Sequence, residues 1–385
     1  MSILKIKSKL PHVGTTIFTE MSQLAAQANA INLSQGFPDY PVNQELLDLL
    51  QKFNQEGHHQ YAPMIGIPAL RAAIQSMVYN TQGIHYDLDQ EITITAGASE
   101  AIFDAIAAFV QYQDEVIIFE PAYDLYTPVV ELFGGVVKPI QLFAPNFNID
   151  WDQVAANISS KTKCIIINHP NNPTGKVLND DDLSALALLA EKHNLLVISD
   201  EVYSRIVFQN ASKFKSIGNI DSLRDRSIVI ASFGKLLHTT GWKIGYALAA
   251  PAITTELRKV HQFNTFSVSH APQHAIAAYL ANENAYNNLD IFFESKYQYL
   301  SKALLDIGFD VLPSEGTYFL NAGYNKLSQA TDATYAKELI TSYGVATIPV
   351  SAFYSGNYQA NLLRFCFAKQ ESTLQAAIER LQVLK

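Results

Sequence analysis

Six short runs of β-branched and other apolar residues alternate with helix-like segments between residues 90 and 250. The runs are EITIT (91–95), EVIIF (115–119), CIIIN (164–168), LLVIS (195–199), SIVIA (227–231) and IGYALA (244–249). Amphipathic stretches such as SEAIFDAIAAFVQ and DDDLSALALLAEKHN lie between several of them. Strands that are apolar along their whole length and separated by helices indicate a mainly parallel sheet covered on both faces. This pattern predicts an α/β core over about residues 40–280.

The segments before and after this core have a different texture. Residues 1–40 combine mixed polarity with a helical pattern near Thr16–Gln27 and the loop NLSQGFPDYP. After residue 285, a long helical region is followed by the strand candidates VATIPV and LLRFCFA and by a final helix. A chain of 385 residues is too long for one ordinary core. We therefore predict an N-terminal arm (1–40) that joins a small domain, a large domain (41–284) and a small C-terminal α+β domain (285–385).

Charge and cysteine content argue against several classes of protein. A net charge of −9 disfavours broad binding to nucleic acid or to acidic membranes. Cys164 and Cys366 each lie in an apolar run, which predicts buried thiols rather than a disulfide framework or a zinc site. The ten histidines show no spacing of the HExxH type, so no metal site is predicted. With no signal-peptide pattern and no apolar stretch of ~20 residues, we expect a cytoplasmic protein with no membrane partner.

Polar segments follow four of the predicted strands. AGASEA follows the first run, and HPNNPTG, DEVY and SFGK follow the third, fourth and fifth. Because ligands bind beyond the carboxyl ends of strands in open parallel sheets, these segments should meet at one site. In AGASEA, a glycine turn that opens a helix predicts an anion site, although a plain helix start capped by Ser99 is the alternative. The spacing matches neither a Walker loop nor a dinucleotide fingerprint.

Three ionisable residues are candidates for chemistry at this edge. Asp200 ends an apolar strand, so its carboxylate needs a compensating cation such as a protonated pyridine nitrogen, or else it caps the next helix. Tyr203 lies one turn further along. Lys235 follows a strand through Ser232, and a neighbouring cation such as Lys243 would lower the pKa of its amine and make it a nucleophile. The alternative for Lys235 is a solvated surface lysine.

Two further residues have open interpretations. Asn172, within HPNNPTG, either binds a ligand or bonds only to its own turn. Arg364 is a lone arginine in the apolar strand candidate LLRFCFA. It either pairs with an internal carboxylate or captures a substrate carboxylate in a bidentate fashion.

Five motifs, in this order, resemble the class I/II aminotransferases of fold type I, which depend on pyridoxal 5′-phosphate (PLP): TAGASEA, NNPTG, SDEVY, SFGKLLHTTGWKIGY and LRFCFA. The resemblance covers essentially the whole chain. The segments LPHVGTTIFTEMS, INLSQGFPD and QYAPMIGIPALR look most like the methionine aminotransferase and kynurenine/glutamine transaminase branch. The resemblance implies a large domain with a mainly parallel seven-stranded sheet between helices, plus a smaller α+β domain.

The resemblance also implies a role for each cofactor-binding candidate. Lys235 would hold PLP covalently and move protons, and Asp200 would pair with the pyridine nitrogen. Asn172 and Tyr203 would hold the phenolic oxygen of the ring, on which Tyr123 would stack. Lys235, Asp200 and Tyr203 are thus the implied catalytic residues. The residues implied to bind the phosphate are Gly97, Ala98, Ser99, Ser232 and Lys243.

The residues implied to bind the substrate are Gly36, Asn172, Arg364, Phe18 and Phe353. Tyr61 would reach the phosphate of a neighbouring subunit, which implies a homodimer. Two departures from the family pattern matter. Lys243 stands where many members have arginine, so the charge is kept but the planar fork is lost. Phe18 stands where some kynurenine-acting relatives place tryptophan, which favours methionine or a similar apolar or aromatic side chain.

These roles imply a ping-pong transfer of the amino group from such an amino acid to a 2-oxo acid. Two alternatives share the early steps and stay open: a kynurenine–oxoglutarate or glutamine transaminase, and a cysteine-conjugate β-lyase. A more remote alternative is a ligand-sensing regulator on the same fold. It would need a DNA-binding module, and the ~40 residues before the core show no helix-turn-helix pattern. We therefore expect small-molecule partners and no nucleic acid.

Overall fold

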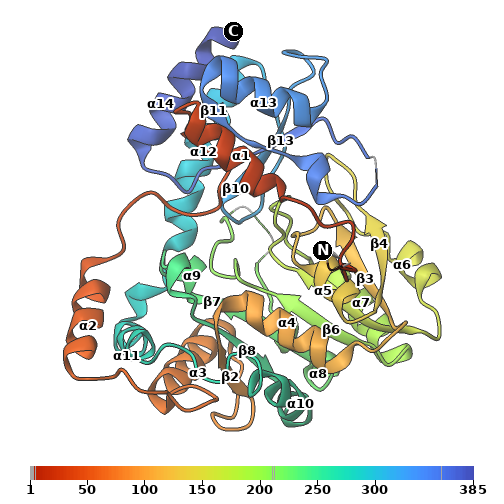
Figure 1. The fold of residues 1–385 in the computed structure, drawn as a ribbon, viewed down its shortest axis with the longest axis vertical. Coiled ribbons are helices and arrows are strands. Elements are labelled where there is room, and N and C mark those ends of the chain that lie inside the picture. Colours follow the sequence, from red (N-terminus) through yellow and green to blue (C-terminus); the bar gives the residue numbers. More distant parts are fainter. Residues whose placement is uncertain (1–3, 5, 210, 212, 357) are drawn as a thin grey trace.

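A seven-stranded sheet forms the centre of the larger part of the molecule (Figure 1). The computed structural model describes residues 4, 6–209, 211, 213–356 and 358–385. The strand order is β2-β8-β7-β6-β5-β3-β4, and β8 alone in this sheet runs antiparallel to its neighbours. The strands are β2 (Ile92–Thr95), β3 (Glu115–Glu120), β4 (Val136–Gln141), β5 (Thr162–Asn168), β6 (Leu196–Asp200), β7 (Ser227–Ser232) and β8 (Gly245–Ala249). The predicted fold class is confirmed.

Successive residues of the central strands pack on opposite faces of the sheet. In β3, Ile117 and Phe119 join one cluster of buried side chains, whereas Val116 and Ile118 join another. Helices that contribute to the first cluster are α2 (Gln44–Gln55), α3 (Pro68–Gln82), α6 (Trp151–Asn157), α7 (Asp180–Lys192), α8 (Asp221–Arg224) and α11 (His270–Tyr279). Those of the second are α4 (Gly97–Phe109), α5 (Tyr126–Leu132) and α10 (Pro251–His261). Burial on both faces explains why the strands are apolar throughout.

Strand β4 has no counterpart among the six apolar runs. It lies at the edge of the sheet, where it pairs only with β3. Its sequence, VVKPIQ, includes Lys138 and Pro139, and most of its residues are exposed or half-buried. Edge strands tolerate proline and lysine because one side of the backbone is unpaired. An edge strand therefore lacks the continuous apolar signal that reveals the central ones.

The smaller part of the molecule has its own core. The strands are β1 (Ile31–Asn32), β9 (Asp310–Val311), β10 (Phe319–Gly323), β11 (Val345–Ala346), β12 (Ile348–Pro349) and β13 (Leu362–Cys366). The helices that share one buried cluster with them are α1 (Ile17–Gln27), α12 (Leu289–Ile307), α13 (Asp332–Tyr343) and α14 (Glu371–Leu381). Strand β1 pairs in parallel with β11, so residues before 40 lie beside the C-terminal segment. The domain boundaries at residues 40 and 284 stay predictions.

The strand candidate VATIPV is two strands rather than one. β11 pairs with β1, whereas β12 pairs with β13 in a four-stranded antiparallel sheet of order β12-β13-β10-β9. The chain passes from one sheet to the other at Thr347, which is fully buried. The remaining short helices are α9 (Phe233–Leu236), η1 (Ile217–Asn219), η2 (Thr240–Trp242), η3 (Glu283–Ala285), η4 (Val350–Phe353) and η5 (Gln382–Leu384). Within the described ranges, no helix has both the length and the apolar character that crossing a membrane requires.

Candidate active site

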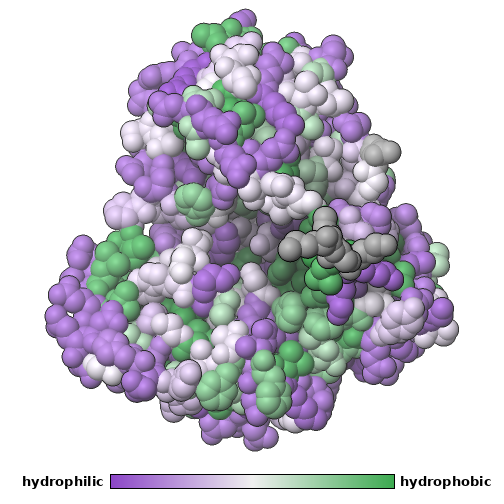
Figure 2. Space-filling view, in the orientation of Figure 1, coloured by the Kyte–Doolittle hydropathy of each residue, from purple (hydrophilic) through white to green (hydrophobic). Residues whose placement is uncertain are grey.

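A cavity of about 200 Å³ lies at the carboxyl ends of the central strands. Figure 2 shows that the molecular surface is hollowed where the larger and smaller parts meet. Because β8 is antiparallel to β7, its first residue, Gly245, pairs with Ser232 at the end of β7. This register brings Lys243, which precedes β8, to the same edge of the sheet. The antiparallel strand thus delivers its amino end where its neighbours deliver their carboxyl ends.

Ten of the predicted site residues line this cavity together. They are Gly97, Ala98, Ser99, Tyr123, Asn172, Asp200, Tyr203, Ser232, Lys235 and Lys243. They lie at or after the carboxyl ends of five strands, β2, β3, β5, β6 and β7, or just before β8, as expected for the carboxyl edge of an open sheet. The predicted residues that do not line it are Phe18, Gly36, Tyr61, Phe353 and Arg364.

The amino end of α4 faces the cavity without a side-chain cap. The helix begins at Gly97, and Ala96 at the N-cap position offers no side-chain hydrogen bond. The alternative in which Ser99 caps the helix is therefore wrong, because Ser99 lies inside the first turn. Lys243 places its Nζ 3.5 Å from Ser99 Oγ. Free backbone N–H groups, the helix dipole and this ammonium together can hold a phosphate.

Close packing explains the glycine at the start of α4. Gly97 has φ +73°, and a Cβ added there would lie 3.0 Å from Lys243 Nζ. A side chain would both strain the backbone and displace the lysine. Gly97 therefore lets the Lys243 ammonium approach the helix end.

A buried ionic network braces α4 from behind. Glu100 accepts a hydrogen bond from the Ala96 N–H and lies 2.8 Å from His261 Nδ1, while the opposite ring nitrogen lies 2.9 Å from the Met64 carbonyl. Asp104 is 3.6 Å from the same imidazole. Burial by itself lowers the pKa of His261, but the hydrogen bonds that its ring donates to the two carboxylates outweigh this effect and raise that pKa to about 9. His261 is therefore a buried imidazolium that fixes the first turn of α4 to α10.

The stabilisation by His261 is expected to depend on pH. Its pKa is about 9 in the folded protein against 6.5 ordinarily. The contribution is therefore fully present below about pH 6.5 and lost as the pH rises through about 9. We expect the free energies of unfolding of wild type and His261→Gln, measured by urea denaturation, to differ most near pH 6, by on the order of 3 kcal/mol. The two values should converge by about pH 10. The exposed His59→Gln serves as control, and a difference independent of pH would contradict a charged His261.

Asp200 is a buried carboxylate with two neutral donors. Its Oδ2 accepts from the Tyr126 hydroxyl at 2.7 Å and its Oδ1 from the Val202 N–H at 3.3 Å. Burial raises the pKa of Asp200, against the opposing effect of these hydrogen bonds and of the Lys235 charge. In the described part of the chain, no cationic side chain lies within 4 Å of it. A cationic donor in the cavity would therefore stabilise its charged form.

Lys235 lies in α9 and points into the cavity. Its Nζ donates to the Gly36 carbonyl at 2.7 Å and lies 5.4 Å from the centre of the Tyr203 ring. Burial is the main reason that the pKa of Lys235 falls to about 8, and the charge of Arg364 adds to it. The charge of Lys243 also lowers the pKa of Lys235, as expected from the sequence, but its effect is smaller than that of burial or of Arg364. Lys235 is thus not a solvated surface lysine but an amine close to its titration point at neutral pH.

Arg364 is buried without a carboxylate partner. It is 1% exposed, and its Nη1 and Nη2 donate at 2.8 Å to Asn172 Oδ1 and to the Ser34 carbonyl. Its Nε has no hydrogen-bond partner among the described residues. No carboxylate of the described residues lies within 4 Å of the guanidinium. Burial lowers the pKa of Arg364 to about 10. Pairing with an internal carboxylate is therefore excluded within the described chain, and the guanidinium retains a free donor.

Aromatic rings surround this guanidinium. Its central carbon lies 3.9 Å from the centre of the Phe319 ring, 5.0 Å from Phe353 and 5.2 Å from Phe18. Phe18 and Phe353 meet edge to face at 5.7 Å. The Gly36 backbone passes so close to Phe319 that an added Cβ would lie 2.5 Å from its Cζ. Arg364 contacts the cavity through Asn172, so these rings form an aromatic cluster around the guanidinium beside the cavity.

Tyr61 does not join the cavity within one chain. Its side chain is 81% exposed and packs edge to face on Phe266, with ring centres 5.5 Å apart. It lies instead beside a separate surface recess near α11. A role at the cavity of another subunit stays a prediction.

Three residues that the sequence did not single out contact the site. Tyr126 bonds Asp200, and Tyr318 donates to the Lys235 carbonyl. Asn168 accepts from the Asn172 N–H at 2.6 Å and donates to the Asp200 carbonyl at 2.9 Å. Asn168 is the last residue of β5, and its place at the carboxyl end of a predicted strand could have identified it as a site residue. Tyr126 and Tyr318 lie in segments that carry no such mark.

Comparison with known proteins gives the family. A model of the family "Aminotransferase class I and II" matches residues 28–381. The chain is 45% identical to the methionine aminotransferase of Escherichia coli K12 over 98% of both chains. A solved E. coli structure, described as identifying a methionine aminotransferase function, covers 99% of this chain and 100% of its own, with 45% identity and a TM-score of 0.96. The kynurenine–oxoglutarate transaminase of Dictyostelium discoideum is 32% identical over 97% of this chain and 94% of its own.

These matches span nearly the whole chain and agree with the cavity at the sheet edge. The chain belongs to the class I and II aminotransferases, PLP-dependent enzymes that transfer amino groups between amino acids and 2-oxo acids.

Proposed function

We propose that this enzyme transfers the α-amino group of methionine, or of a similar apolar or aromatic amino acid, to a 2-oxo acid. The observation that carries the proposal is the aromatic cluster around Arg364. A buried guanidinium with a free donor suits an α-carboxylate, and Phe18 and Phe353 beside it suit an apolar side chain. The similarity to a methionine aminotransferase supports the same substrate class.

The cavity residues fit PLP. We assign the phosphate to the uncapped end of α4 and to Lys243. The protonated ring nitrogen would supply the cation that Asp200 lacks, and the carbonyl carbon would meet the Lys235 amine. The aromatic ring of Tyr123 is available for stacking on the cofactor. Bound PLP supplies an electron sink for the electron pair released at the substrate α-carbon.

The chain's own residues then have distinct tasks. With a pKa of about 8, roughly a tenth of the Lys235 amines are unprotonated at pH 7, enough to act as nucleophile and base. Asp200 holds the proton on the ring nitrogen through its buried negative charge. Arg364 fixes the substrate carboxylate, so that the bond from the α-carbon to hydrogen is oriented toward Lys235. A positioned base of this kind contributes ~10²–10⁴-fold to the rate.

We further propose a homodimer in which Tyr61 reaches the phosphate of the neighbouring subunit. The 81% exposure of Tyr61, which packs on the 42% exposed Phe266, supports a contact surface there. A cytoplasmic location remains a prediction from the sequence.

Visible absorption of the purified enzyme tests the proposed function. The band of bound PLP is expected to disappear when L-methionine is added without an oxo acid, because the amino group moves to the cofactor. It should return when a 2-oxo acid is added. Absence of a PLP band even after adding the cofactor would overturn the proposed cofactor roles. A band that methionine leaves unchanged would overturn only the choice of substrate.

The aromatic cluster around Arg364 also predicts a ranking of substrates. Aspartate would place a second carboxylate against Phe18 and Phe353, and among the described residues the cation that contacts these two rings is Arg364, already proposed to bind the α-carboxylate. We expect kcat/KM for methionine to exceed that for aspartate by at least about 10²-fold. Measuring kynurenine in the same series, and pyruvate release from a cysteine conjugate without an acceptor, separates the proposal from its two alternatives. A kcat/KM for kynurenine above that for methionine would show that kynurenine, not methionine, is the preferred amino-group donor.

A further inference from the structure

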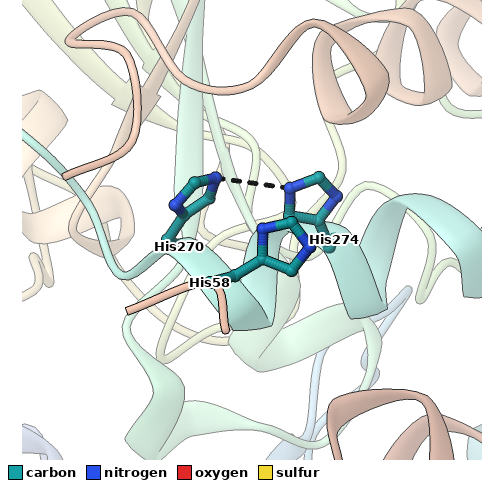
Figure 3. A group of neighbouring side chains, drawn as sticks. All are labelled: His58, His270 and His274. Carbon is teal, nitrogen blue, oxygen red and sulfur yellow. Dashed lines mark hydrogen bonds between the residues drawn. The ribbon is translucent and has the colours of Figure 1, made fainter. Parts of the chain in front are cut away.

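Three histidines gather outside the active-site cavity. His270 and His274 lie one turn apart on α11, and His58 comes from the segment that follows α2. Figure 3 shows the three rings turned toward one another. One nitrogen from each ring lies within 4.8 Å of the others. We propose that His58, His270 and His274 form a binding site for a divalent transition-metal ion of the Zn²⁺ class.

Hydrogen bonding fixes the tautomer of His270. Its Nδ1 lies 3.1 Å from the Gln60 carbonyl oxygen, which can only accept. The hydrogen of the neutral ring is therefore on Nδ1, and the lone pair is on Nε2. Ligating histidines in metal sites characteristically donate their other ring N–H to a carbonyl in this way. His270 is thus already oriented as a ligand.

The separation of the paired nitrogens matches a metal site. His270 Nε2 and His274 Nε2 are 3.3 Å apart. Two nitrogens bound tetrahedrally at ~2.0–2.1 Å from Zn²⁺ are separated by about 3.3–3.4 Å. Two histidines at positions i and i+4 of a helix also present both rings on one face, as in helical zinc motifs. The pair on α11 therefore needs little movement to hold an ion.

His58 supplies the third ligand. Its ring stacks on that of His274, with centres 4.0 Å apart and planes inclined by 30°. Metal binding requires a rotation of this half-buried ring about its terminal torsion, which in histidine takes a broad range of values. Glu56 Oε2 lies 3.7 Å from His58 Nε2. That carboxylate can orient the ring or complete the coordination.

The alternative is a purely aromatic cluster. Phe53 stacks on His274 at 5.1 Å, so part of the arrangement is ordinary ring packing. Without an ion, the 3.3 Å approach of the two Nε2 atoms is an N–H···N hydrogen bond, and it is also the separation that two nitrogens bound to one Zn²⁺ require. A recess of about 530 Å³ lies beside His58 and His270, and Tyr61 lines it too, so the site would lie next to the contact surface proposed for the homodimer. These features favour the metal site.

An all-imidazole set selects the metal. Imidazole suits Zn²⁺, Ni²⁺ and Cu²⁺, whereas Mg²⁺ takes oxygen ligands. A bound ion would join α11 to the segment before α3, where the Ser267 hydroxyl already bonds the Ala62 carbonyl at 2.9 Å. It should therefore raise the melting temperature, because an ion that binds only the folded chain stabilises it. Histidine spacing in the sequence predicted no metal site, so a site here would overturn that prediction. The metal site does not depend on which amino acid the enzyme uses as substrate.

Titration of Zn²⁺ into tag-free, chelator-treated holoenzyme tests the site by calorimetry. We expect one Zn²⁺ per chain, no binding of Mg²⁺, and a tetrahedral visible spectrum when Co²⁺ replaces Zn²⁺. His270→Ala and His274→Ala should each weaken Zn²⁺ binding by at least about tenfold. His59→Ala, which removes an exposed neighbour outside the cluster, is the matched control and should bind normally.

Circular dichroism and the absorption band of bound PLP would verify that each variant is folded. His58→Ala provides a third variant, on a different element, should a change in α11 disturb the helix. No saturable binding by wild type would overturn the proposal. So would binding that survives all three cluster variants, since the ion would then lie elsewhere, for example at Glu100, Asp104 and His261.

Discussion

Lys235→Ala is expected to lower kcat for methionine by at least ~10²–10⁴-fold, the amount that a positioned base contributes. The variant loses the amine that lies in the cavity with a pKa of about 8. It also loses the nucleophile proposed to hold PLP, so the total decrease should exceed this range. PLP should still bind, because the end of α4, Lys243 and Asp200 remain. The measurement is kcat in single- and multiple-turnover experiments with methionine and a 2-oxo acid.

Covalent attachment provides a readout that a loss of folding does not imitate. Borohydride reduction makes the link between lysine and cofactor permanent, so wild type should retain PLP after denaturation and Lys235→Ala should release it. Lys235→Arg keeps a positive charge near Asp200 but has no usable amine, and it should behave like the alanine variant. Added small amines should restore part of the activity of Lys235→Ala only. Retention of PLP by the reduced alanine variant would show that another residue holds the cofactor.

The central sheet was predictable because burial on both faces leaves a strong mark on the sequence. A strand such as CIIIN is apolar up to its last residue, unlike a surface helix, and all six apolar runs end within one residue of the ends of the observed strands. Helix ends were predictable where a cap is present, as at Asn43 before α2 and Thr16 before α1. Strand β4 escaped notice because its edge position permits Lys138 and Pro139.

The cavity was predictable to the extent that strand ends converge. Asp200, Ser232 and Asn172 follow parallel strands, and sheet topology alone brings them together. Lys243 reaches them only because β8 is antiparallel, a fact that no local pattern states. The contact of Arg364 with Asn172 and the Ser34 carbonyl joins three distant segments. Such tertiary contacts leave no periodic signal in any one segment.

The histidine cluster illustrates the same limit. His270 and His274 are spaced by four residues on a helix, but this pair alone is common on helix faces. The third ring, His58, comes from a segment far away in the sequence. Only the packing of α2 against α11 brings the three together. A search for consecutive metal-binding motifs therefore overlooks the cluster.

Arg364→Lys is expected to lower kcat/KM for methionine by roughly 10²–10⁴-fold, because two hydrogen bonds to a charged group contribute ~1.5–3 kcal/mol each. Lysine keeps the positive charge but cannot present two parallel N–H groups to a carboxylate. Asn172 and Ser34, which now bond the two terminal nitrogens, show that the fork geometry is already set. Steady-state kinetics with methionine and a fixed 2-oxo acid give the ratio.

A substrate without the carboxylate separates recognition from structural damage. The amine that keeps the methionine side chain but lacks the α-carboxylate cannot use Arg364, so its low activity in wild type should change little in Arg364→Lys. Wild type should therefore discriminate strongly between the two compounds, and the variant weakly. If both compounds lose activity by the same factor, Arg364 acts only by supporting Asn172 and the Phe319 ring, which it contacts at 3.9 Å. A preserved PLP band would show that the cofactor cavity is intact, because Arg364 does not itself line that cavity.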